Sequence, residues 1–191
     1  IRFLVEKKGV TKYINFNKPF NWEENAHLKG MAIVDHVKIK RDIFNDICKD
    51  KKLCSYENIH IEEYEATPVD ILVRLFKIFD QQKKKKGNLV MHCTAGMGRT
   101  GSVVLAYIGL EHYRKTKKNK VLTPKYFKET ILQEIKEDYH EGAYEELMGW
   151  DGFKGSMWSK TEVEDEAKRA AKLLNDRIDN AIKAIKKYLK L

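Results

Sequence analysis

Residues 88 to 101 constrain the fold of this 191-residue chain more than any other stretch. The apolar run Leu89 to Met91 predicts a buried strand, and the run Thr100 to Lys115 predicts a helix. A short loop between them holds Gly96 and Gly98, and glycine adopts the backbone angles that such a tight loop needs. Cys93, directly after the strand, therefore lies where a strand turns into a helix N-terminus.

This position suits a cysteine that reacts as a thiolate. Free N–H groups at a helix start, with the positive end of the helix dipole, stabilise an anion and lower the pKa of a cysteine. The same groups can hold a phosphate. Five residues separate Cys93 from Arg99, which presents a planar fork to two phosphate oxygens, and Thr100 adds a hydroxyl near the sulfur.

The pattern thus predicts a phosphate-binding loop with a nucleophile at its base. Its expected phosphate-binding residues are Thr94, Ala95, Gly96, Met97, Gly98 and Arg99. The alternative is a structural cysteine buried in front of a helix.

At these residues the chain resembles the cysteine-dependent protein tyrosine phosphatase superfamily and is dual-specificity phosphatase-like. Its motif, His-Cys-x5-Arg-Thr/Ser, is matched by His92, Cys93, Arg99 and Thr100. The resemblance covers roughly residues 28 to 150. It implies an α/β fold, a central mostly parallel sheet flanked by helices, and attack by Cys93 on phosphorus to form a phosphocysteine that water hydrolyses. It implies no metal and no cofactor.

The general acid of the family is an aspartate about thirty residues before the cysteine, and here the corresponding segment carries glutamates. Glu63 stands thirty positions before Cys93 and follows an expected strand, so we predict that it is the acid. Glu62, Glu65 and Asp70 remain alternatives. Asp70 falls in the first turn of a helix expected from Pro68 to about Gln82 with Thr67 as its N-cap, a position that already explains an acidic residue.

Other elements follow from periodicity. We expect strands or an irregular wrap over 2 to 22, a strand at 31 to 34, and an amphipathic helix at about 39 to 49 with Ile43, Phe44 and Ile47 inward. A strand running into a loop is expected over 58 to 68, and helices over 123 to 139.

The C-terminal part forms a separate segment. The clearest break, at 151 to 156, divides a phosphatase domain (1–155) from a C-terminal helical extension (156–191). Early acids, late lysines and an apolar stripe at spacings of four and three predict one long helix over 159 to 191. We expect it to pack on its own domain. Self-association and contact of its basic end with an anionic membrane are the alternatives.

Net charge and cysteine content limit the kinds of binding partner and the cellular compartment that we expect. The net charge of +9 favours acidic partners. We expect a phosphorylated protein as substrate, with an anionic glucan or lipid as alternatives, and no DNA. Three cysteines, an odd number, indicate a reducing compartment, and with no apolar run of membrane-spanning length or signal peptide we expect a cytoplasmic protein. Cys48 or Cys54 pairing with Cys93, as second cysteines do in some relatives, is an alternative to simple packing.

Three functions fit this sequence. The first is a protein tyrosine or dual-specificity phosphatase. The second is a glucan or phosphoinositide phosphatase of the same fold, although Met97 stands where phosphoinositide phosphatases often carry a second lysine. The third is a weakly active pseudophosphatase that binds phosphorylated partners, suggested by the missing aspartate.

Overall fold

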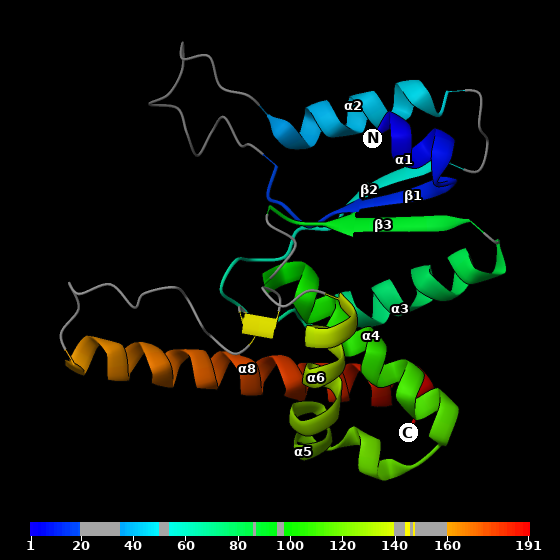
Figure 1. Ribbon diagram of the computed structural model, residues 1–191. Coiled ribbons are helices and arrows are strands. Elements are labelled where there is room, and N and C mark those ends of the chain that lie inside the picture. Colours follow the sequence, from blue (N-terminus) through cyan, green and yellow to red (C-terminus); the bar gives the residue numbers. More distant parts are fainter. Residues whose placement is uncertain are drawn as a thin grey trace. The chain divides into compact units, whose positions relative to one another are not determined.

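The computed structural model describes residues 1–19, 35–49, 54–85, 87–94, 98–139, 144–145, 147 and 160–191 (Figure 1). They form two compact units. The sheet unit comprises Ile1–Ile61 and Phe79–Thr94, and the helical unit comprises Glu62–Ile78 and Ala95–Leu191. The strand expected at 31 to 34 lies outside the described residues.

The sheet unit is built on three parallel strands. They are β1 (Val10–Asn15), β2 (Ser55–Asn58) and β3 (Asn88–His92), in the order β2-β1-β3. In the register, Asn15 pairs with Asn58 on one side and with His92 on the other, so the carboxyl ends of all three strands meet at one edge. The expectations of a mostly parallel sheet and of a strand at 89 to 91 are confirmed.

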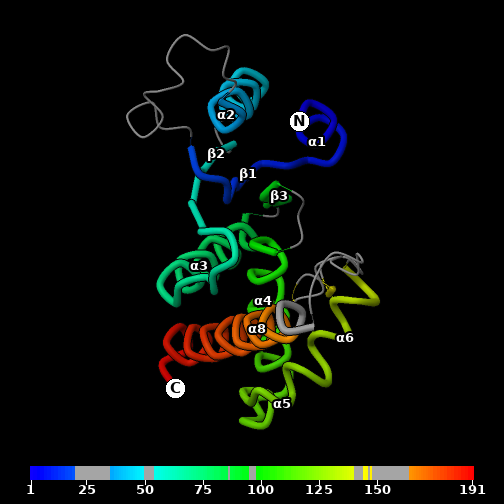
Figure 2. The backbone as a smooth tube through the Cα atoms, turned by 90° about the vertical axis from the view of Figure 1, so that its left-hand side faces the viewer, coloured from blue at the N-terminus to red at the C-terminus, as the bar shows by residue number. Residues whose placement is uncertain are grey.

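Helices α1 (Arg2–Lys7) and α2 (His36–Ile47) cover one face of this sheet (Figures 1 and 2). They enclose a core of Val5, Val10, Tyr13, Phe44 and Cys48. Helix α2 begins at His36 because the Asp35 side chain accepts hydrogen bonds from the N–H groups of Val37 and Lys38, both at 3.0 Å.

Three expectations for this unit were wrong. Residues 2 to 7 are helical rather than extended, and Ile43 is 45% exposed instead of facing the core. The predicted strand at 58 begins earlier, as β2, and Ile59 and Ile61 belong to the following loop although both are buried. A helix of only six residues is too short to show a helical period in the sequence. A buried loop residue such as Ile59 or Ile61 gives the same apolar signal as a strand residue.

The helical unit contains the first part of α3 (Val69–Lys84) and the whole of α4 (Gly98–Thr116), which confirms both predicted helices. The segment after α4 is divided into η2 (Asn119–Leu122), α5 (Pro124–Tyr126), η3 (Phe127–Ile131), α6 (Leu132–Glu134) and η4 (Ile135–Tyr139). Thr123 caps α5 by accepting from the Tyr126 N–H at 3.3 Å. The helices expected over 123 to 139 are confirmed, with π-helical turns at η3 and η4.

The long C-terminal helix is α8 (Lys160–Leu189), and it packs against α4 within the helical unit. Its second half buries Leu174, Ile178, Ala181 and Ile185, as the apolar stripe predicts. Ala167 and Ala171, earlier in the same stripe, are exposed. Among the described residues, no helix is both long and apolar enough to span a membrane.

Candidate active site

Cys93 lies at the carboxyl edge of the sheet unit, directly after β3, with only 4% of its surface exposed. The chain on either side of it is anchored to the segment that follows β1. The Phe16 N–H donates to the His92 carbonyl at 2.9 Å, and the Thr94 hydroxyl donates to Oδ1 of Asn17 at 3.2 Å. Thr94 is the first residue of the predicted phosphate-binding loop. Residues 95 to 97 of that loop lie outside the described part of the chain.

A group of asparagines holds the segment after β1 in place. The fully buried Asn15 accepts from the Asn17 N–H at 3.0 Å and donates through Nδ2 to the Tyr56 hydroxyl at 2.9 Å. Nδ2 of Asn58 donates to the carbonyls of Asn15 and Asn17, at 2.7 and 2.9 Å. We did not predict these residues from the sequence. Polar residues at the ends of two strands were the available signal, because the carboxyl edge of a parallel sheet is where sites form.

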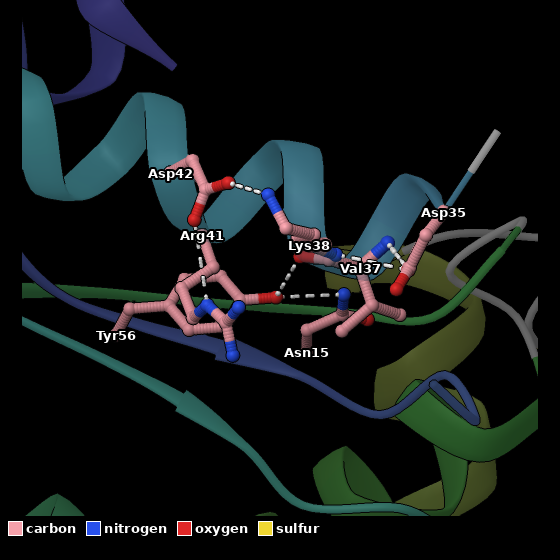
Figure 3. A network of polar contacts seen from close by, with 7 residues as sticks. All are labelled: Asn15, Asp35, Val37, Lys38, Arg41, Asp42 and Tyr56. Carbon is pink, nitrogen blue, oxygen red and sulfur yellow. Dashed lines mark hydrogen bonds and ion pairs between the residues drawn. The ribbon is translucent and has the colours of Figure 1, made fainter. Parts of the chain in front are cut away.

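Figure 3 shows how this edge is connected to the start of α2. The Tyr56 hydroxyl donates to the Val37 carbonyl at 3.3 Å while it accepts from Asn15. Burial raises the pKa of Tyr56, and the hydrogen bond from Asn15 opposes this shift only in part. The hydroxyl therefore stays protonated and acts as a donor and acceptor between β1, β2 and α2.

His92, the last residue of β3, contacts the backbone of the candidate nucleophile. Its Nδ1 lies 2.7 Å from the Cys93 carbonyl oxygen, so Nδ1 carries the proton and donates. Its ring meets Tyr13 edge-on at 5.1 Å, and its buried Nε2 has no partner among the described residues. Burial lowers the pKa of His92, the bond to Cys93 opposes this, and Lys40 lowers it further. A neutral His92 thus orients the Cys93 peptide.

In the helical unit, two residues predicted to share the site are in contact. Arg99, in the first turn of α4, is 9% exposed, and its Nη2 donates to Oε1 of Glu63 at 3.2 Å. Glu63 projects from the loop before α3, and its side chain is 58% exposed. Tyr64, the next residue, has a φ of 60°, a left-handed angle that a bulky residue rarely adopts.

The other candidates in this unit have different surroundings. Asp70 lies in the first turn of α3 and pairs with Lys187 at 2.6 Å. Thr100 is 2% exposed, and its hydroxyl has no hydrogen-bond partner in the described part of the chain. Thr67, expected to cap α3, likewise keeps a buried hydroxyl without a partner among these residues. The described residues contain no group of three or more potential metal ligands.

The register of the sheet unit separates Cys54 from Cys93. Cys54 precedes β2, whose first residue, Ser55, is level with Lys12 and Leu89. Cys93 lies four residues beyond Leu89, which corresponds to about 13 Å along a strand. A disulfide needs Cα atoms within about 7 Å, so a bond between Cys54 and Cys93 does not fit this sheet. Cys48 is packed in the core under α1 and α2.

Comparison with known proteins identifies the family of the chain. Residues 15–145 match the model of the Swiss Army Knife protein DSP-PTPase phosphatase domain. This match covers more than half of the chain, so the protein belongs to this family of phosphatase domains, in agreement with the resemblance found in its motif.

Two curated relatives also carry the name of dual specificity protein phosphatases. The dual specificity protein phosphatase CDC14C of Homo sapiens is 41% identical over 51 residues, which is 27% of this chain and 11% of that protein. A probable dual specificity protein phosphatase of Dictyostelium discoideum is 34% identical over 55 residues, covering 28% of this chain and 14% of that protein. The matched segments thus span only a small part of these relatives. No solved structure matches the chain.

Proposed function

We propose that this protein hydrolyses phosphomonoesters through a phosphocysteine intermediate, as a protein tyrosine or dual-specificity phosphatase. The observation that carries the proposal is the contact between Arg99 and Glu63, at 3.2 Å. It joins the arginine of the His-Cys-x5-Arg-Thr motif to the carboxyl group that we predict as the acid. Membership of a family of phosphatase domains supports the same reaction.

In the proposed reaction, the Cys93 thiolate attacks phosphorus while Arg99 and the backbone of residues 94 to 98 hold the non-bridging oxygens. The bond from phosphorus to the leaving oxygen breaks, and protonated Glu63 gives that oxygen its proton. The Glu63 carboxylate then takes a proton from the water that attacks the phosphocysteine. Phosphate is released, and the hydroxyl of Thr100 stabilises the departing Cys93 thiolate.

Phosphorylated proteins are the proposed substrates. The proposed domain occupies residues 1–155, with 156–191 as its helical extension, and the odd number of cysteines, three, supports a reducing compartment such as the cytoplasm. The following experiment also tests two alternatives. One is a glucan or a phosphoinositide as substrate, and the other is a role limited to binding phosphorylated partners.

The test is steady-state hydrolysis of p-nitrophenyl phosphate and of a phosphotyrosine peptide by the parent protein, Cys93→Ser and Cys54→Ser. We expect turnover by the parent and by Cys54→Ser, and none by Cys93→Ser. Cys54→Ser is the matched control, because Cys54 lies at the amino end of β2, away from the carboxyl ends of the strands. Phosphorylated glucan and phosphoinositide are assayed in parallel, and a higher kcat/KM on either replaces phosphoprotein as the substrate. A parent that binds the phosphopeptide but turns over nothing would show a binding module instead.

A further inference from the structure

The second half of α8 is attached to the part of the chain that carries Glu63. Nδ2 of Asn180 donates to the Thr67 carbonyl at 3.2 Å, although the two residues are 113 positions apart. Further along, Lys187 pairs with Asp70 at 2.6 Å, and Tyr188 meets Phe76 edge-on with ring centroids 5.6 Å apart. All of these residues belong to the helical unit.

The segment held in this way is the loop of residues 62 to 68, which we call the acid loop. After Glu63 the loop passes through Tyr64, whose φ is 60°, and Thr67, close to its end, is only 2% exposed. Between these points the loop has no helix or strand. Its geometry therefore depends on anchors from elsewhere, and a left-handed tyrosine persists only where the surroundings enforce it.

The two polar anchors differ in strength. Lys187 and Asp70 have side chains that are 59% and 83% exposed, and such exposed ion pairs contribute little. Asn180 is partly buried, and the carbonyl that it meets belongs to a buried residue, where a lost hydrogen bond leaves an acceptor without water. Asn180 also bonds the backbone of the loop itself, four residues from Glu63, whereas Lys187 bonds a residue inside α3.

From this arrangement we infer that Asn180 is a positioning residue for the general acid. It fixes the carbonyl at the end of the acid loop, and the loop in turn keeps the Glu63 carboxyl group beside Arg99. The C-terminal helix is then part of the catalytic apparatus, because it sets the position of the proton donor. This inference rests on the proposed function, since Glu63 must donate a proton for its position to matter.

Leaving-group dependence tests this role. An acid that protonates the leaving oxygen matters most for a poor leaving group such as phenol and least for p-nitrophenol. We expect Asn180→Ala to lower kcat/KM on phenyl phosphate roughly tenfold, because kcat/KM reports the step in which the leaving group departs and small displacements of a catalytic group have large effects on rate. On p-nitrophenyl phosphate the change should stay within about twofold. A general loss of folded protein would lower both rates equally.

Two further variants make the test specific. Asn175→Ala, an exposed asparagine on the same helix, is the matched control and should behave as the parent. Asn180→Leu keeps most of the side-chain volume without a donor, and it should reproduce the effect if Asn180→Ala folds poorly. In a Glu63→Gln background, Asn180→Ala should cause no further loss on phenyl phosphate, because it acts through Glu63.

The outcomes separate the inference from the proposed function. If the parent hydrolyses no phosphoester, the proposed function fails and the inference fails with it. If Glu63→Gln loses activity on phenyl phosphate but Asn180→Ala and Asn180→Leu lower kcat/KM equally on both substrates, or on neither, the proposed function stands and the role of Asn180 is refuted. Additive losses in the double variant would also refute it.

Discussion

Nη2 of Arg99 lies 3.2 Å from Oε1 of Glu63, a residue 36 positions earlier in the chain. The arginine is almost fully buried, whereas the Glu63 side chain is largely exposed. A buried guanidinium with an exposed carboxylate at its edge can exchange that carboxylate for another anion without a large rearrangement. In the proposed function, the substrate phosphate replaces this carboxylate on Arg99, and Glu63 then lies beside the leaving group as its proton donor.

The first prediction concerns Glu63→Gln. The amide keeps the shape of the side chain but carries no acidic proton, so kcat/KM on phenyl phosphate should fall about 100-fold, with a smaller loss on p-nitrophenyl phosphate. The high-pH limb of the kcat profile, which reports loss of the proton from the acid, should flatten. Steady-state kinetics across pH measure both effects.

Glu65→Gln is the control for this prediction, since Glu65 is an exposed glutamate of the same loop. It should leave the leaving-group dependence unchanged. If Glu65→Gln or Asp70→Asn shows the losses described and Glu63→Gln does not, the acid is one of those residues.

The second prediction concerns the pH dependence of stability at His92. Burial holds the pKa of folded His92 below its usual value of 6.5. As the pH falls below 6.5, the unfolded chain binds a proton at His92 before the folded chain does, so the free energy of unfolding decreases. Above that pH both states are neutral, and His92 contributes no slope.

Urea unfolding of the parent and of His92→Asn at about pH 7.5 and about pH 5.5 measures this effect. We expect the parent to lose more stability than His92→Asn on acidification. His36→Asn, an exposed histidine at the start of α2, is the control and should show the same slope as the parent. Equal slopes for all three proteins would contradict the prediction.

The third prediction concerns Asn58→Ala. Its amide donates to the carbonyls of Asn15 and Asn17, and each carbonyl loses this donor when it is removed, although the Asn15 carbonyl still accepts from the Ile59 N–H at 3.0 Å. We expect the free energy of unfolding to fall by about 1–3 kcal/mol, as measured in urea. Asn88→Ala removes an exposed side-chain bond to the Lys8 carbonyl, so its cost should stay below about 1 kcal/mol. Equal costs would show that Asn58 has no special role at the carboxyl edge.

The fourth prediction concerns Gly109 in α4. A Cβ atom on this residue would overlap the ring of the fully buried Phe127. Alanine at an unobstructed helix position would stabilise the protein, but here overpacking should destabilise it by about 1–3 kcal/mol. In a Phe127→Leu background, which frees space, Gly109→Ala should cost less. Thermal unfolding of the four proteins of this cycle gives the coupling, and an additive result would show that the ring is not the obstacle.

Much of the fold was predictable because it depends on local signals. Leu89 to Met91 is a short apolar run before a glycine loop, and α3 and α8 show clear helical periodicity. The first helix was missed because six residues give too little periodicity to recognise. The expected strand from Asn58 was displaced because Ile59 and Ile61 are buried in the loop after β2.

The candidate site was predictable to a smaller extent. Cys93, Arg99 and Thr100 could be named because the motif is contiguous, and no contact is needed to recognise it. The four possible acids could not be separated, because all lie within a few residues of each other and spacing alone does not say which carboxylate faces an arginine. The structure places Glu63 against Arg99 and Asp70 against Lys187.

The sequence by itself therefore determined the strand, the cysteine, the helix that follows, and the family to which these residues belong, since each depends on neighbours in the chain. Only the tertiary structure decided which carboxylate meets Arg99, which asparagines hold the segment beside Thr94, and that Asn180 reaches the acid loop. Those contacts join residues up to 113 positions apart. They follow from strand register and helix packing, which bring distant side chains together without leaving a local pattern in the sequence.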